Sequence, residues 1–261
     1  MDATRKITWN ITQWRTRTLL IVDLGLAAIL IALIFLIQAA GTESAPAQPA
    51  PGALLYATTF DAFNDEWDLY PGRKSAQVVG GQLQVNIGDT NDGAFTWLDR
   101  RFSDFDLTVE ATQLAGPDDN GYGVVFRHQD AQHYFHFLIS GDGYYQVLRR
   151  NGPDLLEDVT TISGWRRSEH INLGQDAPNR LRVVARGDRF TFFVNGHQLE
   201  LCLGENAIAE TCQGGELTDV LIDPTFAHGH IGVAAGTLSQ PGALIGFDNL
   251  VVVGPEPAPA Q

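Results

Sequence analysis

The chain has 261 residues, a formal net charge of −14 and a sequence pI near 4.7. Because phosphate binding needs clustered Lys and Arg side chains, this acidic balance argues against nucleic acid as a partner. Its length allows one domain of ordinary size in addition to targeting and linker segments.

The first 40 residues predict a membrane anchor. Residues 1–18 are polar and basic, and residues 19–40 form an apolar run with Asp23 as its one charge. A helix needs roughly 20 apolar residues to cross a bilayer, and basic flanks stay in the cytoplasm. We therefore expect a cytoplasmic N-terminus (1–18), a transmembrane helix (19–40), and a single-pass protein of the cell membrane with its C-terminal part extracytoplasmic. Cleavage after Ala39-Ala40 is the alternative to a retained anchor.

Two Pro/Ala-rich stretches enclose the remaining sequence. Residues 41–53 contain Pro46, Pro49 and Pro51 and predict a semi-extended linker, and residues 254–261 predict a disordered tail. The residues between them, 54–253, have the size of one all-β domain.

Within 54–253 the apolar residues recur with a period of two. Alternation runs through 105–112, 134–139, 144–149 and 190–195, and glycine-rich breaks separate these segments. Each such segment predicts a strand with one buried face. Asn195-Gly196 predicts a two-residue hairpin turn, since both central residues of that turn need positive φ. Many short strands without helical periodicity indicate a β-sandwich or barrel.

The two cysteines are Cys202 and Cys212. They are close in sequence and lie in the part expected outside the cytoplasm, where a disulfide is permitted. Such a bond would stabilise the fold by roughly 3 kcal/mol in the chain-entropy model. Two buried free thiols are the alternative.

Eight short motifs occur in one order along the domain, namely TTFD (58–61), YGVVFR (122–127), HYFHFLIS (133–140), GYYQV (143–147), NRLRV (179–183), FTFFVNG (190–196), GHIGV (229–233) and FDN (247–249). Together they resemble the concanavalin A-like lectin/glucanase superfamily, with the laminin-G-like modules related to the 3-keto-disaccharide hydrolase domain as the nearest likeness. The resemblance implies a jelly-roll β-sandwich over about 54–253, following one transmembrane helix. It leaves the function open, because the superfamily holds hydrolases, lectins and structural modules.

Evidence for catalysis is weak. The glucanases of this superfamily carry Glu-x-Asp-x-x-Glu on one strand, and this motif is missing from the sequence. The nearest pattern, Asp104-x-Asp106-x-x-x-Glu110, has the wrong spacing and order for the paired carboxyl groups of a retaining glycosidase. We therefore expect no catalytic residues, while a hydrolase with a site assembled from separate loops stays open.

A ligand site is predicted from strand alternation. Sugar binding needs flat apolar faces together with fixed polar groups. If the strands at 108–112, 123–127, 134–138 and 144–148 are neighbours, one open sheet face gathers Glu110, Arg127, Tyr134, His136, Tyr144 and Gln146. The alternative is an ordinary solvated face with cross-strand pairs such as Glu110–Arg127. The indoles of Trp67, Trp97 and Trp165 are assigned to the core or its rim, with stacking on a ligand as the alternative.

One metal is considered. Calcium takes oxygen ligands, and modules resembling this one often carry it structurally. Asp61 near the first strand and Asp248 on the last could meet at one sheet edge, which makes them the candidate calcium ligands. Solvated acidic loops are the alternative.

The sequence therefore favours a membrane-anchored extracytoplasmic binding module with a glycan as its ligand. A sugar hydrolase of glycoside or keto-sugar type is the second reading. An accessory subunit that docks a membrane-protein partner, through the anchor and a domain face, is the third.

Overall fold

The computed structural model describes residues 45–62, 65–155 and 157–257. The chain divides into two units, 1–45 and 46–261, and the second unit holds the domain. The predicted segments 1–18 and 19–40 lie outside the described residues. Within the described ranges, no helix has the length and apolarity that a membrane crossing requires.

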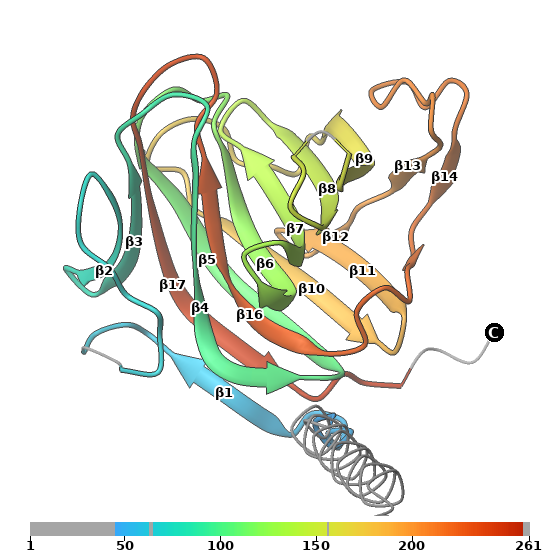
Figure 1. The fold of residues 1–261 in the computed structure, drawn as a ribbon, viewed down its shortest axis with the longest axis horizontal. Helices are drawn as coiled ribbons and strands as arrows, with labels where there is room; N and C mark the ends of the chain where they lie inside the picture. The colour runs from blue at the N-terminus through green and yellow to red at the C-terminus, as the bar shows by residue number, and fades with distance from the viewer. Residues whose placement is uncertain (1–44, 63–64, 156, 258–261) are drawn as a thin grey trace, which may run out of the picture. The chain divides into compact units, whose positions relative to one another are not determined.

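Every regular element of the described ranges is a β-strand, and most of the strands build two sheets (Figure 1). The first sheet has nine strands in the order β12-β11-β10-β5-β17-β3-β2, with β1 paired to β17 and β15 paired to β11. Its strands are β1 (Leu54–Thr58), β2 (Lys74–Val79), β3 (Gln82–Ile87), β5 (Phe105–Ala115), β10 (Asn179–Arg186), β11 (Arg189–Val194), β12 (His197–Gln198), β15 (Leu221–Ile222) and β17 (Ala243–Val253).

The second sheet has six strands in the order β4-β16-β6-β7-β8-β9. They are β4 (Gly93–Phe102), β6 (Gly121–Asp130), β7 (His133–Ser140), β8 (Tyr144–Asn151), β9 (Val159–Arg167) and β16 (Gly229–Gly236). A separate two-stranded ribbon, β13 (Leu201–Leu203) with β14 (Glu216–Thr218), lies beside β9.

Phenylalanines from the two sheets meet in the core. Phe126 of β6 lies 5.4 Å from Phe190 of β11, and Phe137 of β7 lies 5.2 Å from Phe192, measured between ring centroids. Each of these rings is at most 1% exposed. The alternation in 105–112, 134–139, 144–149 and 190–195 places one face of each strand in this core, so the predicted all-β sandwich is confirmed for the described residues.

The Asn195-Gly196 turn is confirmed as well. Val194 pairs with His197, which leaves Asn195 (φ 50°) and Gly196 (φ 85°) as the two turn residues. Positive φ at both positions is the conformation that a type I′ hairpin requires.

Both ends of the domain are fixed at one end of the sandwich. The Gly52 amide donates to the Gly254 carbonyl (2.8 Å), and Ser103 Oγ donates to the Ala47 carbonyl (3.4 Å). Arg186 Nε donates to the Glu256 carbonyl at 2.6 Å. Residues 46–53 and 254–257 therefore make contacts with the domain. The rest of the predicted linker (41–44) and tail (258–261) lies outside the described residues, so the semi-extended linker and the disordered tail stay predictions.

Candidate functional site

The six predicted ligand residues do not gather on one face. Glu110 is in β5 of the nine-stranded sheet, where it accepts a hydrogen bond from Asn249 Nδ2 (2.9 Å). Arg127 is in β6 of the other sheet and is fully buried. The predicted cluster and the Glu110–Arg127 pair are therefore wrong. The physical reason is that the chain crosses between the sheets after β5, so β5 is not a neighbour of β6, β7 or β8.

Arg127 turns into the core at a β-bulge. Its φ is 52°, and the pairing of β6 with β7 shifts register just after Phe126. Its guanidinium donates to the carbonyls of Ala227, Gly187 (2.9 Å) and Phe102 (3.4 Å). Burial lowers the pKa of Arg127 to about 10, and Asp104 at 3.9 Å partly opposes that shift. A fully buried guanidinium in this setting is structural and cannot reach an external ligand.

The other four predicted residues share the outer face of the six-stranded sheet. Tyr134 and His136 lie on β7, Tyr144 and Gln146 lie on β8, and their chain neighbours on the inward side pack into the core. Leu138, on the same face, is opposite Gln146 in the β7–β8 pairing.

Aromatic rings from distant strands join this face. Phe95 of β4 lies 5.4 Å from Tyr134, Trp97 stacks on His128 at 4.6 Å, and Tyr134 stacks on His136 at 4.6 Å. We call these five residues the aromatic cluster. The alternation of 93–102 could have placed Phe95 and Trp97 on one face, but nothing in the sequence shows that β4 lies in this sheet.

The aromatic cluster shows that the outer face is concave. Two strands, β16 and β6, separate β4 from β7, which corresponds to roughly 14 Å across a flat sheet. The rings of Phe95 and Tyr134 can meet only if the sheet bends toward this face. Trp165 of β9 supports the same conclusion, because its Cη2 lies 3.1 Å from where a Cβ on Gly121 of β6 would stand.

The two histidines of the aromatic cluster are held neutral. Burial lowers the pKa of His128 to about 4 and the pKa of His136 to about 3. Both ring nitrogens of His128, and Nε2 of His136, have no hydrogen-bond partner among the described residues. The cluster therefore presents an uncharged aromatic surface at neutral pH.

A pocket opens at one end of the concave face. It encloses about 220 Å³ and is lined by Asp119, Ser140, Asp142, Tyr144, Trp165 and Leu238. We call it the Tyr144–Trp165 pocket. Ser140 Oγ donates to Asp142 Oδ1, and the same hydroxyl accepts from the Tyr144 amide at 3.2 Å. Of the predicted ligand residues, only Tyr144 lines this pocket.

The pocket lies at the end of the domain opposite residues 46–53 and 254–257. Its lining comes partly from the β5–β6, β7–β8 and β16–β17 connections. Strand β5 begins beside Ser103, near the linker contacts, and ends at Ala115, next to the first of these connections. Eleven extended residues span about 35 Å. The pocket therefore opens well away from the point where the chain enters the domain.

A larger hollow on the nine-stranded sheet is less suited to a ligand. It encloses about 730 Å³ and is lined by two arginines, Arg180 and Arg182, of which Arg182 is already paired with both oxygens of Asp106 at 2.7 Å. The same guanidinium covers the Phe193 ring at 4.8 Å. Its charge and its aromatic surface are thus engaged within the protein, so volume alone does not identify the site.

The predicted calcium ligands are near each other without forming a recognisable cage. Burial raises the pKa of Asp248, with Glu110 and Asp61 adding to that shift, so the three carboxylates share one region. Thr59 Oγ1 donates to Asp61 Oδ2 at 2.7 Å. Over the described part of the chain, no group of three or more His, Cys, Asp or Glu side chains is arranged to hold a metal. Calcium at Asp61 and Asp248 stays a prediction.

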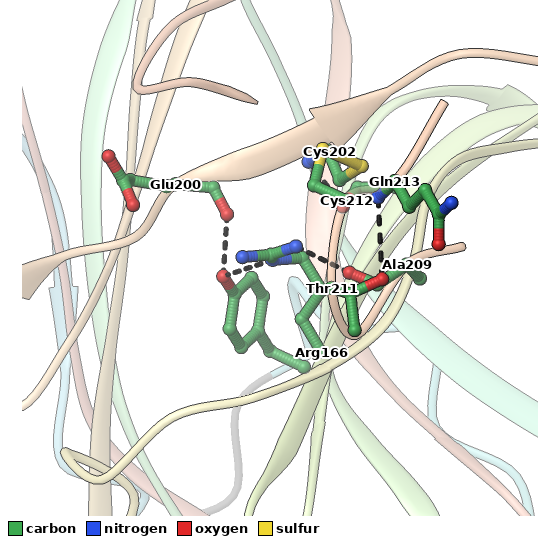
Figure 2. The surroundings of a disulfide bond; sticks show 9 residues. Arg166, Glu200, Cys202, Ala209, Thr211, Cys212 and Gln213 are labelled. Atoms are coloured by element: carbon green, nitrogen blue, oxygen red, sulfur yellow. Dashed lines mark hydrogen bonds between the residues drawn. A yellow bond between two sulfur atoms is a disulfide. The ribbon is translucent and has the colours of Figure 1, made fainter. Parts of the chain in front are cut away.

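The predicted disulfide is confirmed. Cys202 and Cys212 are bonded, with their Cα atoms 5.4 Å apart (Figure 2). The closed loop is attached to β9, where Cys202 N donates to Ser163 Oγ (3.1 Å) and the Arg166 side chain donates to the Ala209 carbonyl. Because Trp165 lies between these two β9 residues, the loop supports the strand that carries one wall of the pocket.

Comparisons with known proteins identify the fold. No protein-family model matches the chain. No curated protein matches it either. Solved structures do match, and the three described below match at low sequence identity.

The carbohydrate-binding module CBM66 of Bacillus subtilis is 15% identical, with a TM-score of 0.50 over 72% of this chain and 95% of that one. A Bacillus subtilis protein of unknown function with a galectin-like fold is 12% identical, with a TM-score of 0.53 over 78% and 97%.

The GH43 protein BlXynB of Bacillus licheniformis is 14% identical, with a TM-score of 0.52 over 76% of this chain. The match spans only 39% of that longer protein. At these identities the likeness concerns architecture alone. The chain is an all-β sandwich similar in fold to carbohydrate-binding, galectin-like and GH43 proteins, which is compatible with the concanavalin A-like resemblance.

Proposed function

We propose that this chain is a non-catalytic carbohydrate-binding protein, displayed outside the cytoplasm on the predicted anchor at 19–40. The observation that carries the proposal is the Tyr144–Trp165 pocket. Two aromatic side chains provide apolar surface for the CH groups of a sugar ring, and Asp119 and Asp142 provide acceptors for its hydroxyls. Few other ligands combine an apolar face with several hydroxyl donors.

The pocket size favours one sugar ring. Its volume of about 220 Å³ is below the ~300–1,000 Å³ typical of sites for drug-sized ligands. Beyond the pocket, the concave face continues toward the aromatic cluster, so a longer glycan would have further surface to contact.

The test uses the full chain in nanodiscs, applied to a broad glycan array and followed by calorimetry on the glycans that bind. Residues 46–53 should be kept in any variant, because they contact the domain. Trp165→Ala and Tyr144→Ala should each weaken binding by about tenfold, which corresponds to ~1.4 kcal/mol of aromatic contact.

Phe193→Ala is the matched control, because Phe193 is a half-buried aromatic residue on the other sheet, outside the pocket. It should leave affinity unchanged. Unfolding temperatures measured for all three variants separate lost contacts from lost folding. Absence of binding to every glycan on the array would contradict the proposal. Unchanged affinity in Trp165→Ala would contradict it as well.

One observation favours a second candidate, a sugar hydrolase. Asp119 and Asp142 line the same pocket, and glycosidases act through two carboxyl groups placed on either side of the scissile bond. Sugar release from bound glycans, lost in Asp119→Asn and in Asp142→Asn, would establish that reading. Binding without release supports the non-catalytic one.

A further inference from the structure

The charged residues that line the Tyr144–Trp165 pocket are of one sign. Among its six lining residues, two carry carboxylates, and no lysine or arginine is present. The nearest cations in sequence, Arg166 and Arg167, follow Trp165 in β9. Arg167 is opposite Tyr144 in the β8–β9 pairing, but both arginines line a different hollow, beside Glu169 and Glu200. Arg166 is also occupied, donating to Tyr145 Oη at 3.3 Å and to the Ala209 carbonyl.

One acceptor in this pocket, Asp142, is held in place by hydrogen bonds. The Asp142 amide donates to the Asp118 carbonyl (3.0 Å), and one carboxylate oxygen of Asp142 accepts from Ser140 Oγ. These bonds hold the side chain at the turn between β7 and β8. The second oxygen of Asp142 remains as an acceptor for a ligand hydroxyl, since a carboxylate can accept several hydrogen bonds.

The aromatic wall is fixed as well. Two atoms of the Trp165 ring, Cη2 and Cζ2, lie 3.1 and 3.4 Å from the position that a Cβ on Gly121 would occupy. Because Gly121 has no side chain, the ring can rest against the β6 backbone. The pocket is therefore assembled from an apolar wall and anionic acceptors, and its lining offers no cation to receive a negative group.

We infer that the pocket selects uncharged sugars and excludes glycans whose bound ring carries a carboxylate or a sulfate. This inference rests on the proposed function and names its ligand class. A neutral ring donates hydroxyls to Asp119 and Asp142, whereas an anionic ring would bring like charges within a few ångströms. At an effective dielectric constant between those of a protein surface and water, such repulsion weakens binding by about tenfold or more.

The test compares matched neutral and acidic probes on the full chain in nanodiscs. The pairs are lactose with 3′-sialyllactose, lactose with 3′-sulfolactose, and methyl-esterified with de-esterified polygalacturonan. All are measured in EDTA and again with calcium. For each pair in which the neutral probe binds, the acidic probe should bind at least tenfold more weakly.

The variant Asp119→Asn/Asp142→Asn should reduce the ratio of neutral-probe affinity to acidic-probe affinity severalfold. The amides keep acceptor oxygens and remove the charge. Asp65→Asn/Asp188→Asn is the matched control. It changes the net charge equally at residues outside the pocket and should leave the ratio unchanged.

Equal or tighter binding of acidic probes would overturn the inference. An affinity ratio that is unchanged in Asp119→Asn/Asp142→Asn would overturn it too. A requirement for calcium would overturn it as well, since the carboxylates would then hold a cation. These results leave the proposed function standing, because a glycan still binds. If no glycan on the broad array binds, it is the proposed function that fails.

Discussion

Removing the disulfide should destabilise the domain by about 3 kcal/mol. Cys202 and Cys212 are separated by 10 positions. In the chain-entropy model, closing a loop of this length raises the free energy of the unfolded chain by roughly 3 kcal/mol at 25 °C. The sulfurs belong to residues that are 2% and 8% exposed, so alanine is the suitable replacement for both. For a domain of this length, the loss corresponds to a fall in Tm of about 6–12 °C.

The measurement is urea unfolding and calorimetry of Cys202→Ala/Cys212→Ala beside the wild type, with and without reductant. Because Cys202→Ala/Cys212→Ala has no disulfide to reduce, its stability should not depend on reductant, and it therefore serves as its own control. A Ser pair reports the added cost of polar groups at these two buried positions.

The same variant reports on the pocket. The loop holds β9 through Ser163 and Arg166 on either side of Trp165, so sugar affinity should fall along with stability. A destabilisation below about 1 kcal/mol would refute the reasoning that the bond stabilises the domain by restricting the unfolded chain. Unchanged affinity in a fully folded Ala pair would refute its support of β9.

Three further outcomes are expected. Arg127→Met should destabilise the fold by about 3–5 kcal/mol in denaturant unfolding, because it leaves Asp104 and three carbonyls without their buried partner; a smaller loss than in an exposed Arg→Met variant would contradict this. Stability should fall as the pH drops from about 6.5 to about 4, since the pKa of His128 is about 4 when folded and 6.5 when unfolded. The unfolded chain then binds more protons, and His128 by itself accounts for a loss of roughly 3 kcal/mol in the free energy of unfolding. A His128→Phe variant that loses as much stability on acidification as the wild type would refute this assignment to His128. Gly121→Ala should weaken sugar binding severalfold by displacing Trp165, with little change in Tm, and unaltered affinity would argue against that ring as a pocket wall.

Local patterns in the sequence determined the elements of this domain. Alternation of apolar residues marked the strands, because in an extended chain successive side chains point to opposite faces. Asn195-Gly196 specified its turn, since few residue pairs adopt positive φ twice. The bond between Cys202 and Cys212 was predicted from their short separation, in a part of the chain that is expected outside the cytoplasm. Each of these inferences needs only residues that are close along the chain.

Tertiary structure alone decided the site. Alternation assigns a residue to a face, but it does not say which strand lies beside it or in which sheet. Glu110 and Tyr134, which the alternation assigned to one face, belong to different sheets. Phe95 contacts Tyr134 across two intervening strands. A single bulge reversed the expected direction of Arg127, because a shift of one residue exchanges the two faces of a strand. Trp165 meets Gly121 only because the sheet curves, and curvature is a property of the assembled sheet.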